Sequence, residues 1–315
     1  MLTIFSCPKP FREHIDTIQR NAIRSWTLLK PRPEIILIGD EEGVSDVCRE
    51  YGLRHIPALD CNEIGTPLVK SVFDIGRTHA GNRVLAYVNA DIILLDDFVS
   101  AVSRVTGLLN GRPFLLLGGR WNVKAIDIDF SDLSWQEKAK QFASASGWFD
   151  GEIAMDYFIF PKDIDWQLPP FLLGRSSWDS YFCYRAEKMR MPVIDVSQAV
   201  TAIHQDHQYT HMKAGADLTM KNREVNYNFR LLGFGKRYTI RDCTHYLVPE
   251  GIRPRKHRFL RYVVERLKEV ELWMVYYLRD RFHPYSYPLY VVLRQANKCL
   301  KVFFGLFHRT RKELC

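Results

Sequence analysis

Residues 84–94 read Val-Leu-Ala-Tyr-Val-Asn-Ala-Asp-Ile-Ile-Leu, and the rest of the chain is best interpreted outward from them. A polar triplet, Asn89-Ala90-Asp91, stands between two apolar runs, residues 84–88 and 92–94. Short apolar runs bounded by polar residues are typical of buried strands. The triplet is therefore predicted to project from the edge of a sheet, at the carboxyl end of the first run.

Strands and helices alternate on both sides of this stretch. Apolar residues at helical spacing predict helices over residues 14–26, 44–51, 69–80 and 178–190. β-rich runs predict strands over residues 2–5, 34–38, 52–56, 83–88, 114–117, 154–160 and 192–195. This order predicts an α/β fold with a mostly parallel sheet and helices on both of its faces. Residues 120–150 are predicted to form a polar, Trp-rich insert in which Trp121, Trp135 and Trp148 either stack on a bound ligand or pack into the core.

The composition is that of a globular protein with its basic residues concentrated at one end. Of 315 residues, 47% are hydrophobic and 25% charged, which excludes collagenous and wholly disordered chains. The net charge is +8, yet residues 253–315 hold 15 Lys and Arg against 5 Asp and Glu, which leaves 29 against 31 for residues 1–252. A main body without excess positive charge does not favour nucleic-acid binding. We predict two domains, residues 1–250 and a basic, aromatic-rich helical tail at 251–315.

The tail has two interpretations. Clustered Lys and Arg with interspersed Trp, Tyr and Phe suit a helix at an anionic membrane surface, which residues 253–315 would then contact. The alternative is that its helices pack on the main body and expose a solvated basic face.

Cysteine usage and the N-terminal sequence concern the cellular compartment. The seven cysteines are scattered and form no CxxC pair, so neither a zinc site nor a disulfide framework is indicated and a reducing compartment is favoured. Residues 1–11 do not have the pattern of an export signal, and no run reaches 18 apolar residues. We expect a cytoplasmic protein, peripheral on the inner face of the membrane if the tail binds there.

Polar residues follow several of the predicted strands. Ligands bind open α/β sheets beyond the carboxyl ends of the strands. The polar groups there are Ser6-Cys7-Pro8-Lys9, Gly39-Asp40, Gly65-Thr66-Pro67 and Asn89-Ala90-Asp91. Neither GxxxxGK[ST] nor GxGxxG occurs, which argues against a P-loop or a glycine-fingerprint dinucleotide site.

Three of the polar motifs have both a chemical and a purely structural interpretation. Asp91 would hold Mg²⁺ or Mn²⁺ against a diphosphate, or the triplet is a polar turn. Asp179, at the start of a predicted helix after Gly174, would be a general base near an acceptor hydroxyl, or it caps the helix. The segment 204–211 contains His204, His207 and His211, a density that favours metal or phosphate contact over a satisfied core or surface histidine. Taken alone, this oxygen-poor cluster would suggest zinc.

Seven short blocks, taken in order, resemble the nucleotide-diphospho-sugar transferases, specifically bacterial glycosyltransferases of the A-type fold similar to family 2. The blocks cover roughly residues 1–235, and it is their order that makes the likeness specific. They are Thr3-Ile4-Phe5-Ser6 with residues 18–26; residues 39–43; residues 65–69; Tyr87-Val88-Asn89-Ala90-Asp91-Ile92; residues 156–161; Gly174-Arg175 with Trp178-Asp179; and residues 201–205.

This resemblance implies a single Rossmann-like A-type domain, a nucleotide-diphosphate-sugar donor, a glycan or lipid-linked acceptor, and a divalent cation, Mn²⁺ or Mg²⁺. It implies an inverting hexosyl transfer of the kind used in polysaccharide biosynthesis. The implied roles are catalytic base for Asp179; metal binding for Asp91 and His204, with His207 or His211 as substitutes; donor binding for Phe5, Ser6, Asp40, Thr66, Asn89 and Asp91; and acceptor binding for Asp156, Arg175 and Trp178. Asn89 stands where the family has the first acid of its DxD motif, so it adds no charge.

Two other functions are compatible with the sequence. A nucleotidyltransferase also uses an α/β sheet and a carboxylate-bound metal, but it typically opens with a Gly-rich, basic loop, and the loop after residues 2–5 contains no Gly. A non-catalytic module that binds sugar or nucleic acid would bind its ligand without turnover.

Overall fold

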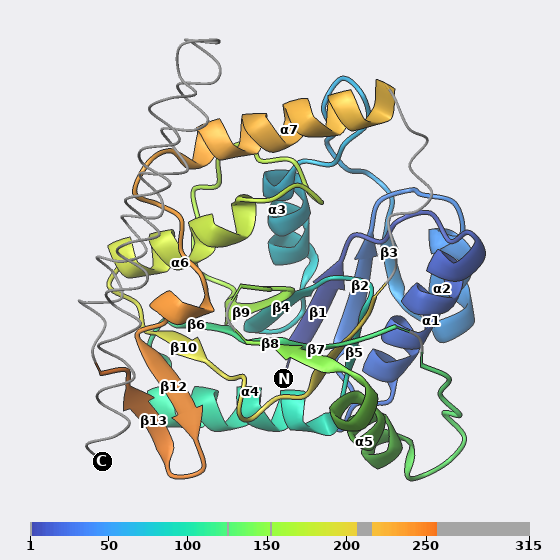
Figure 1. Ribbon diagram of the computed structural model, residues 1–315, viewed down its shortest axis with the longest axis vertical. Helices are drawn as coiled ribbons and strands as arrows, with labels where there is room; N and C mark the ends of the chain where they lie inside the picture. The colour runs from blue at the N-terminus through green and yellow to red at the C-terminus, as the bar shows by residue number, and fades with distance from the viewer. Residues whose placement is uncertain (1, 125, 152, 207–215, 257–315) are drawn as a thin grey trace, which may run out of the picture. The chain divides into compact units, whose positions relative to one another are not determined.

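The central sheet has nine strands in the order β13-β12-β10-β6-β9-β4-β1-β2-β3 (Figure 1). The structure is a computed structural model that describes residues 2–124, 126–151, 153–206 and 216–256, with side chains from residue 223 onward in the last range. The strands are β1 (Leu2–Ser6), β2 (Glu34–Ile38), β3 (Arg54–Ile56), β4 (Val84–Val88), β6 (Leu115–Leu117), β9 (Tyr157–Pro161), β10 (Val193–Asp195), β12 (His245–Val248) and β13 (Gly251–Pro254). β9 and β13 run antiparallel to their neighbours, and the other pairs are parallel. The mostly parallel α/β sheet predicted from the sequence is confirmed, with an antiparallel strand inserted between β4 and β6.

Helices cover both faces of this sheet. The described helices are α1 (Glu13–Thr27), α2 (Val44–Tyr51), α3 (Val69–His79), α4 (Asp96–Leu109), α5 (Trp135–Ser146), α6 (Trp178–Lys188), α7 (Ala216–Leu232) and the 3-10 helix η1 (Ile240–Asp242). Of these, α5 packs on a second sheet instead. Apolar residues of α1, α2 and α4 form one core cluster with Ile4 of β1, and those of α3 and α6 form a second with Phe5. Because successive strand residues point to opposite faces, two adjacent residues contribute to two separate cores.

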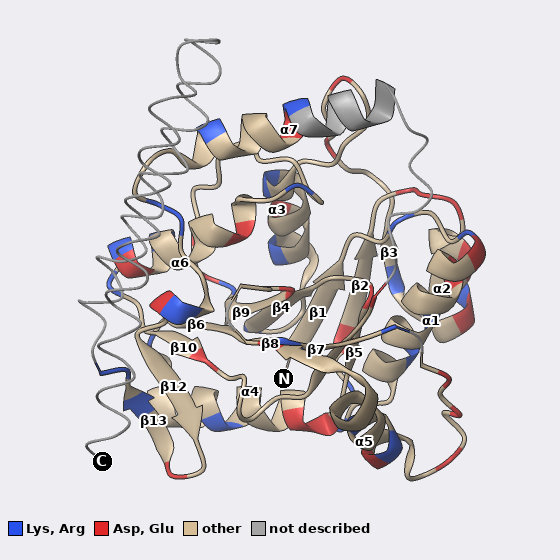
Figure 2. Ribbon diagram, viewed as in Figure 1, with Lys and Arg blue, Asp and Glu red and all other residues tan. Residues whose placement is uncertain are grey.

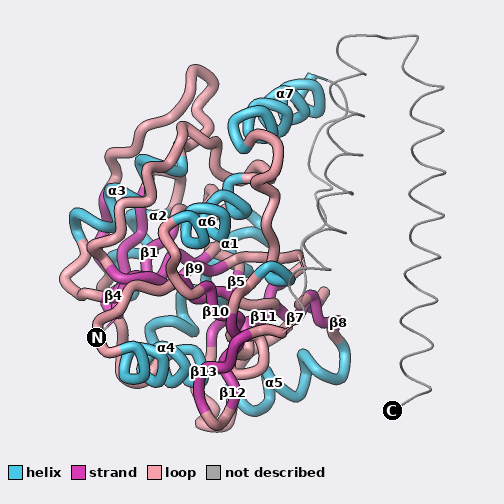
Figure 3. The backbone as a smooth tube through the Cα atoms, turned by 90° about the vertical axis from the view of Figure 1, so that its left-hand side faces the viewer, coloured by secondary structure: helices cyan, strands magenta, loops and turns pink. Residues whose placement is uncertain are grey.

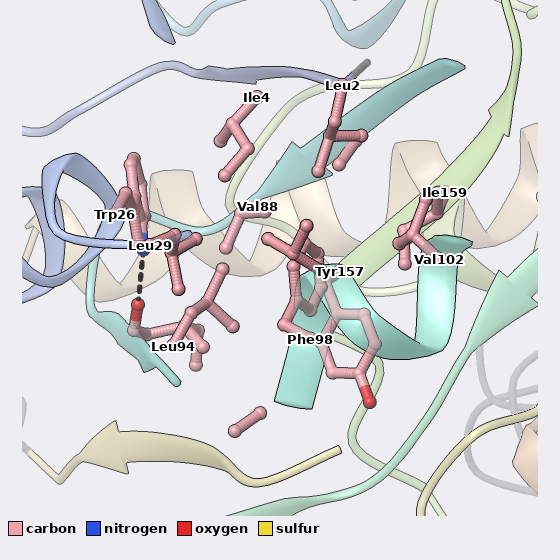
Figure 4. Packing of buried hydrophobic residues seen from close by; sticks show 14 of the residues in the cluster. Leu2, Ile4, Trp26, Leu29, Val88, Leu94, Phe98, Val102, Tyr157 and Ile159 are labelled. Atoms are coloured by element: carbon pink, nitrogen blue, oxygen red, sulfur yellow. Dashed lines mark hydrogen bonds between the residues drawn. The ribbon is translucent and has the colours of Figure 1, made fainter. Parts of the chain in front are cut away.

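Trp26 is one of the large buried side chains of the first core (Figure 4). This side chain is fully buried, and its indole nitrogen donates a hydrogen bond of 2.8 Å to the carbonyl oxygen of Ile92. A buried indole N–H needs such a partner. On the same side, the rings of Phe98 and Tyr157 meet edge to face at 5.7 Å. These contacts fix the chain immediately after the polar triplet, since Ile92 follows Asp91.

Gly76 provides a test of how tightly the second core is packed. A Cβ at this position of α3 would lie 2.6–2.8 Å from ring atoms of Phe5. That ring is fully buried and held between Phe73 and Tyr87 at centroid distances of 5.2 and 5.6 Å, so it has little room to move. Gly76→Ala should therefore lower the free energy of unfolding by about 1–3 kcal/mol, measured by urea denaturation.

Gly107→Ala is the matched control. Gly107 also lies inside a helix, α4, but a Cβ there would meet nothing within 4 Å. Because alanine is the better helix former, this variant should be more stable than the wild type by up to about 1 kcal/mol. Equal effects of the two substitutions would contradict the tight contact between α3 and β1.

A second, four-stranded sheet corrects the prediction for residues 120–150. Its order is β5-β11-β7-β8, with β5 (Ile92–Leu94), β7 (Arg120–Val123), β8 (Trp148–Asp150) and β11 (Ala202–Gln205). The predicted polar insert therefore consists of two strands joined by helix α5. β7 pairs with β11, and β8 pairs with the other edge of β7 (Figure 3). Trp135 of α5 is buried in the third core cluster with Ile203. The strands were missed because three or four residues are too few to establish an alternating pattern.

Charged residues lie mainly on the helices and loops around the sheet (Figure 2). The central strands β1, β4, β6 and β9 contain none. The described residues of Met1–Leu232 and Tyr238–Lys256 form one compact unit. No helix within the described part of the chain is both long enough and apolar enough to cross a membrane. The predicted helical tail lies outside the described residues from 257 onward.

Candidate active site

Three polar residues meet at the edge of the sheet where β4 ends and β9 begins. Ser6, at the end of β1, donates from Oγ to the carbonyl oxygen of Val88 at 2.6 Å. The backbone N–H of Asn89 donates to the carbonyl oxygen of Asp156 at 2.9 Å. Because β9 is antiparallel to β4, its first residues lie at the same edge as the last residues of β4. This reversal brings Asp156, far away in sequence, next to the polar triplet.

The side chain of Asn89 connects two other groups. Its Oδ1 accepts a hydrogen bond of 2.9 Å from the hydroxyl of Tyr87, and its Nδ2 donates one of 2.8 Å to Oδ1 of Asp156. The first residue of the triplet thus orients a neighbouring carboxylate.

Asp156 is buried and paired with Arg120 of β7. The distance from Nη1 of Arg120 to Oδ2 of Asp156 is 2.7 Å. Burial raises the pKa of Asp156, the Arg120 charge opposes this, and the negative charge of Asp91 adds to it. The ion pair of Asp156 with Arg120 therefore connects the two sheets. Asp156 is also close enough to Asp91 for their charges to interact. The sequence analysis did not identify Arg120.

Asp91 faces His204 of β11. Strand β11 pairs antiparallel with β5, which places His204 opposite Ile92. The distance from Nε2 of His204 to Oδ2 of Asp91 is 3.7 Å. On the other side of the ring, Nδ1 lies 3.0 Å from Oδ1 of Asn122. Because an amide oxygen only accepts, this bond requires the proton on Nδ1, so Asn122, which the sequence analysis also missed, fixes the ring with Nε2 toward Asp91.

Asp179 lies in the first turn of α6, two residues after a strained residue, Ser177. Ser177 has φ 90° and ψ −25°, a left-handed conformation that costs a non-glycine residue about 1–3 kcal/mol and is often found at functional sites. Oδ1 of Asp179 accepts a hydrogen bond of 2.8 Å from the backbone N–H of Ser180. Burial raises the pKa of Asp179 to about 6, opposed by backbone hydrogen bonds and reinforced by the negative charge of Asp156. The residue as a whole is half-buried.

The remaining predicted residues lie around this cluster or beneath it. Asp40 is exposed on the turn after β2. Thr66 and Arg175 both bond to Glu224 of α7, at 2.6 Å and 2.7 Å. The side chains of Phe5 and Trp178 are buried in the second core cluster, where Trp178 meets Tyr87 at a centroid distance of 5.5 Å. Ligand contacts by these two side chains stay predictions, and in this structure both pack.

The structure thus brings together Asn89, Asp91, Asp156 and His204 and couples Asp179 to them through Asp156. Among the described residues there is no group of three or more His, Cys, Asp or Glu side chains arranged to hold a metal ion. His207 and His211 lie outside the described residues. Asp91 and His204 offer one carboxylate and one imidazole nitrogen, a donor set that suits Mn²⁺ or Mg²⁺ when substrate phosphates supply further oxygens.

No protein-family model and no curated protein sequence matches the chain. Over most of its length, its structure matches solved glycosyltransferases of the A-type fold and a nucleotidyltransferase. S. aureus TarS 1–349 in complex with UDP-GlcNAc has 12% identity and a TM-score of 0.46, over 97% of this chain and 92% of that chain. Glucosyl-3-phosphoglycerate synthase from Mycobacterium tuberculosis, in complex with Mn²⁺, UDP-glucose and phosphoglyceric acid, has 10% identity and a TM-score of 0.43, over 74% of this chain and 78% of that chain.

The nucleotidyltransferase is 4-diphosphocytidyl-2C-methyl-D-erythritol synthase from Anaerococcus prevotii. It has 11% identity and a TM-score of 0.36, over 74% of this chain and 96% of that chain. Identities and scores this low describe a likeness of fold, and we derive the function from this chain's own residues.

Proposed function

We propose that this chain is an inverting glycosyltransferase that moves a sugar from a nucleotide-diphosphate-sugar donor to a hydroxyl of a glycan or lipid-linked acceptor. The observation that carries the proposal is the convergence of Asp91, Asp156, Asp179 and His204 at one edge of the sheet, with the pKa of Asp179 raised to about 6. A carboxylate with that pKa is ionised at neutral pH and still basic enough to accept a proton.

In the proposed reaction Asp179 takes the proton of the acceptor hydroxyl. The acceptor oxygen attacks the anomeric carbon, a new C–O bond forms, and the bond to the nucleoside diphosphate breaks with its electron pair on the departing phosphate oxygen. Displacement from the side opposite the leaving group inverts the anomeric centre. Burial is the main cause of the raised pKa of Asp179, and the negative charge of Asp156, which is held in place by Asn89 and Arg120, adds to it.

Asp91 and His204 are the proposed holders of a divalent cation, Mn²⁺ or Mg²⁺. When bound, the cation supplies positive charge against the diphosphate of the donor. Asn122 keeps Nε2 of His204 turned toward Asp91. Metal-binding histidines usually form such a hydrogen bond through the ring nitrogen that does not bind the metal. The nucleoside is proposed to lie over the ends of β1 and β2, within reach of Asp40, Ser6, Thr66 and the backbone at Phe5.

Trp148 is the proposed platform for an acceptor sugar. It lies on β8 opposite Asn122 of β7, and residues directly opposite in a sheet share a face, so Trp148 lies on the face that carries Arg120 and Asn122. It is 49% exposed, whereas Trp135 is buried. Trp148→Ala should raise the KM for a sugar acceptor several-fold, because stacking contributes about 0.5–1.5 kcal/mol, with little change in kcat or in the KM for the donor. Phe142→Ala, an exposed aromatic of α5, is the control and should change none of these constants.

The test of the function is release of nucleoside diphosphate from UDP-, GDP-, dTDP- and CMP-linked sugars (release of CMP for the last), with Mn²⁺, Mg²⁺ or EDTA. Turnover of one donor that is lost in Asp179→Asn supports the proposal. A nucleotidyltransferase would instead release pyrophosphate from a nucleoside triphosphate and a sugar phosphate. A binding module would bind a donor in calorimetry without turnover. Either of these results would overturn the proposed glycosyltransferase function.

We further propose that the glycosyltransferase domain, predicted over residues 1–250, includes strand β13 as well, and that the basic remainder of the predicted tail lies at an anionic membrane surface, on the cytoplasmic side. The sheet itself extends through Pro254. The support for the membrane contact is the composition of the tail. Flotation with phosphatidylserine liposomes tests it, since removal of residues 257–315 should abolish co-flotation, and equal flotation of both forms would contradict it.

A further inference from the structure

Helix α7 carries two buried polar side chains, Glu224 and Asn228, that the proposed chemistry does not use. Glu224 is 6% exposed and Asn228 is fully buried. Residues four apart lie on the same face of a helix. Buried carboxylate and amide groups are costly unless they are hydrogen-bonded, so the partners of these two residues show what this face of α7 holds.

Glu224 joins two loops of the proposed active site. Its Oε1 accepts hydrogen bonds from Oγ1 of Thr66 at 2.6 Å and from Nδ2 of Asn62 at 2.9 Å. Its Oε2 accepts from Nε and Nη2 of Arg175 at 2.7 and 2.6 Å. Burial alone would raise the pKa of Glu224, but the hydrogen bonds from Thr66, Asn62 and Arg175 lower it below its ordinary value. One ionised carboxylate therefore ties the loop on the proposed donor side to the loop on the acceptor side.

Asn228 holds the backbone of the acceptor-side loop. Its Oδ1 accepts from the N–H of Leu172 at 2.8 Å, and its Nδ2 donates to the carbonyl oxygens of Leu172 at 2.9 Å and Ser176 at 3.2 Å. Ser176 immediately precedes Ser177, the residue in the left-handed conformation, and Asp179 follows two residues later. The amide thus fixes both ends of a five-residue segment that leads into the first turn of α6.

The two loops also pair with each other. The N–H of Leu173 donates to the carbonyl oxygen of Pro67 at 2.8 Å, and the N–H of Val69 donates to that of Phe171 at 2.8 Å. Helix α7 lies beside α6 in Figures 1 and 3. The loop before α3, the loop before α6 and the buried face of α7 therefore form one hydrogen-bonded junction.

We infer that Glu224 and Asn228 are positioning residues, which hold the loop before α6 so that Asp179 faces the reacting hydroxyl. Through Glu224, the loop before α3 keeps its position relative to the loop before α6. This inference rests on the proposed role of Asp179 as the base. Neither residue touches substrate in it, since they act through Arg175, Leu172 and Ser176. A displacement of about 1 Å at a reacting group can cost about 100-fold in rate, so the junction has a large effect on turnover.

The test compares Glu224→Gln and Asn228→Ala with Arg223→Gln, an exposed residue of the same helix. Glu224→Gln keeps the shape of the side chain but removes the charge that faces Arg175. Both junction variants should lower kcat by about 10–100-fold, while Arg223→Gln matches the wild type. Asn228→Ala should leave the affinity for nucleoside diphosphate unchanged, because the bonds of Asn228 go to the acceptor-side loop. In carboxyl NMR, the Asp179 titration, assigned by its absence in Asp179→Asn, should move from about 6 toward the ordinary value of 3.8 as the loop loosens.

The NMR titration separates this inference from the proposed function, because it requires no turnover. If the wild type transfers no sugar, the proposed function fails, and a shifted Asp179 titration still supports the junction. If the two variants only lower the unfolding midpoint, with the Asp179 titration and kcat unchanged, Glu224 and Asn228 are merely structural and the inference is overturned.

Discussion

Asp179→Asn should lower kcat for sugar transfer by about 10²–10⁴-fold, the usual contribution of a positioned general base. The amide keeps the size of the side chain and can still accept the hydrogen bond from Ser180, but it cannot take a proton from the acceptor hydroxyl. Affinity for the nucleoside diphosphate should stay unchanged, because the proposed donor contacts come from β1, β2 and the Asn89-Ala90-Asp91 triplet. Initial-rate kinetics with the active donor, together with calorimetry of the diphosphate, measure both quantities.

The stability of this variant distinguishes lost chemistry from lost structure. Because the folded state raises the pKa of Asp179 above its ordinary 3.8, the protonated form favours folding, and that contribution is lost as the pH rises through about 6. At pH 7 the charged carboxylate therefore works against folding. Asp179→Asn removes this charge and should be at least as stable as the wild type at pH 7. Inactivity accompanied by unfolding would contradict this account.

The pH profile follows from the same shift. The base must be ionised, so kcat/KM should rise with pH up to about 6 and then level off. The negative charge of Asp156, the residue immediately before β9, raises the pKa of Asp179 further. Asp163→Asn, which removes an exposed carboxylate, should leave both rate and profile unchanged. A wild-type profile that is flat between pH 5 and 8 would contradict a base whose pKa is raised to about 6.

The order of the elements in the first half of the chain could be predicted from the sequence because each element carries its own local signal. The predicted strand over residues 34–38 and helix over 44–51 coincide with β2 and α2. Prolines and glycines mark their ends: Gly43 and Gly52, both with positive φ, flank α2. Asp91 was placed at the sheet edge because its two apolar neighbouring runs are buried strands, β4 and β5.

The partners of the site residues could not be predicted, because they depend on which strands lie side by side. Asp156 meets Asn89 only because β9 enters the sheet antiparallel beside β4. Arg120 and Asn122 share a face of β7, a period-two spacing that is visible in the sequence but has no meaning until β7 is known to be a strand. Glu224 and Asn228 show a four-residue spacing, yet their bonds span 49 to 162 residues of chain.

Because position 89 is an amide, the site has one carboxylate fewer than the motif it resembles. In the resemblance that the sequence suggested, position 89 carries the first acid of the DxD motif, whereas here the amide of Asn89 bonds to Tyr87 and Asp156. A second carboxylate at this position would face the buried charge of Asp156. The chain thus keeps one carboxylate, Asp91, on the side of His204, and a second, Asp156, in an ion pair with Arg120. Binding of the diphosphate should therefore depend heavily on Asp91.

Asp91→Asn should lower kcat/KM for the donor by about 100-fold or more, because it removes the only carboxylate of the proposed metal pair. The decisive readout is binding. For the nucleoside diphosphate of the active donor, the wild type should bind more tightly with Mn²⁺ than with EDTA, and Asp91→Asn should bind equally under both conditions. Asn122→Ala should give an intermediate result, a loss of about 10–100-fold in Mn²⁺ affinity, since it leaves Asp91 and His204 in place but removes the bond that orients the imidazole. If Mn²⁺ strengthens binding as much in Asp91→Asn as in the wild type, the cation is held elsewhere and the pairing of Asp91 with His204 serves only to join β5 and β11.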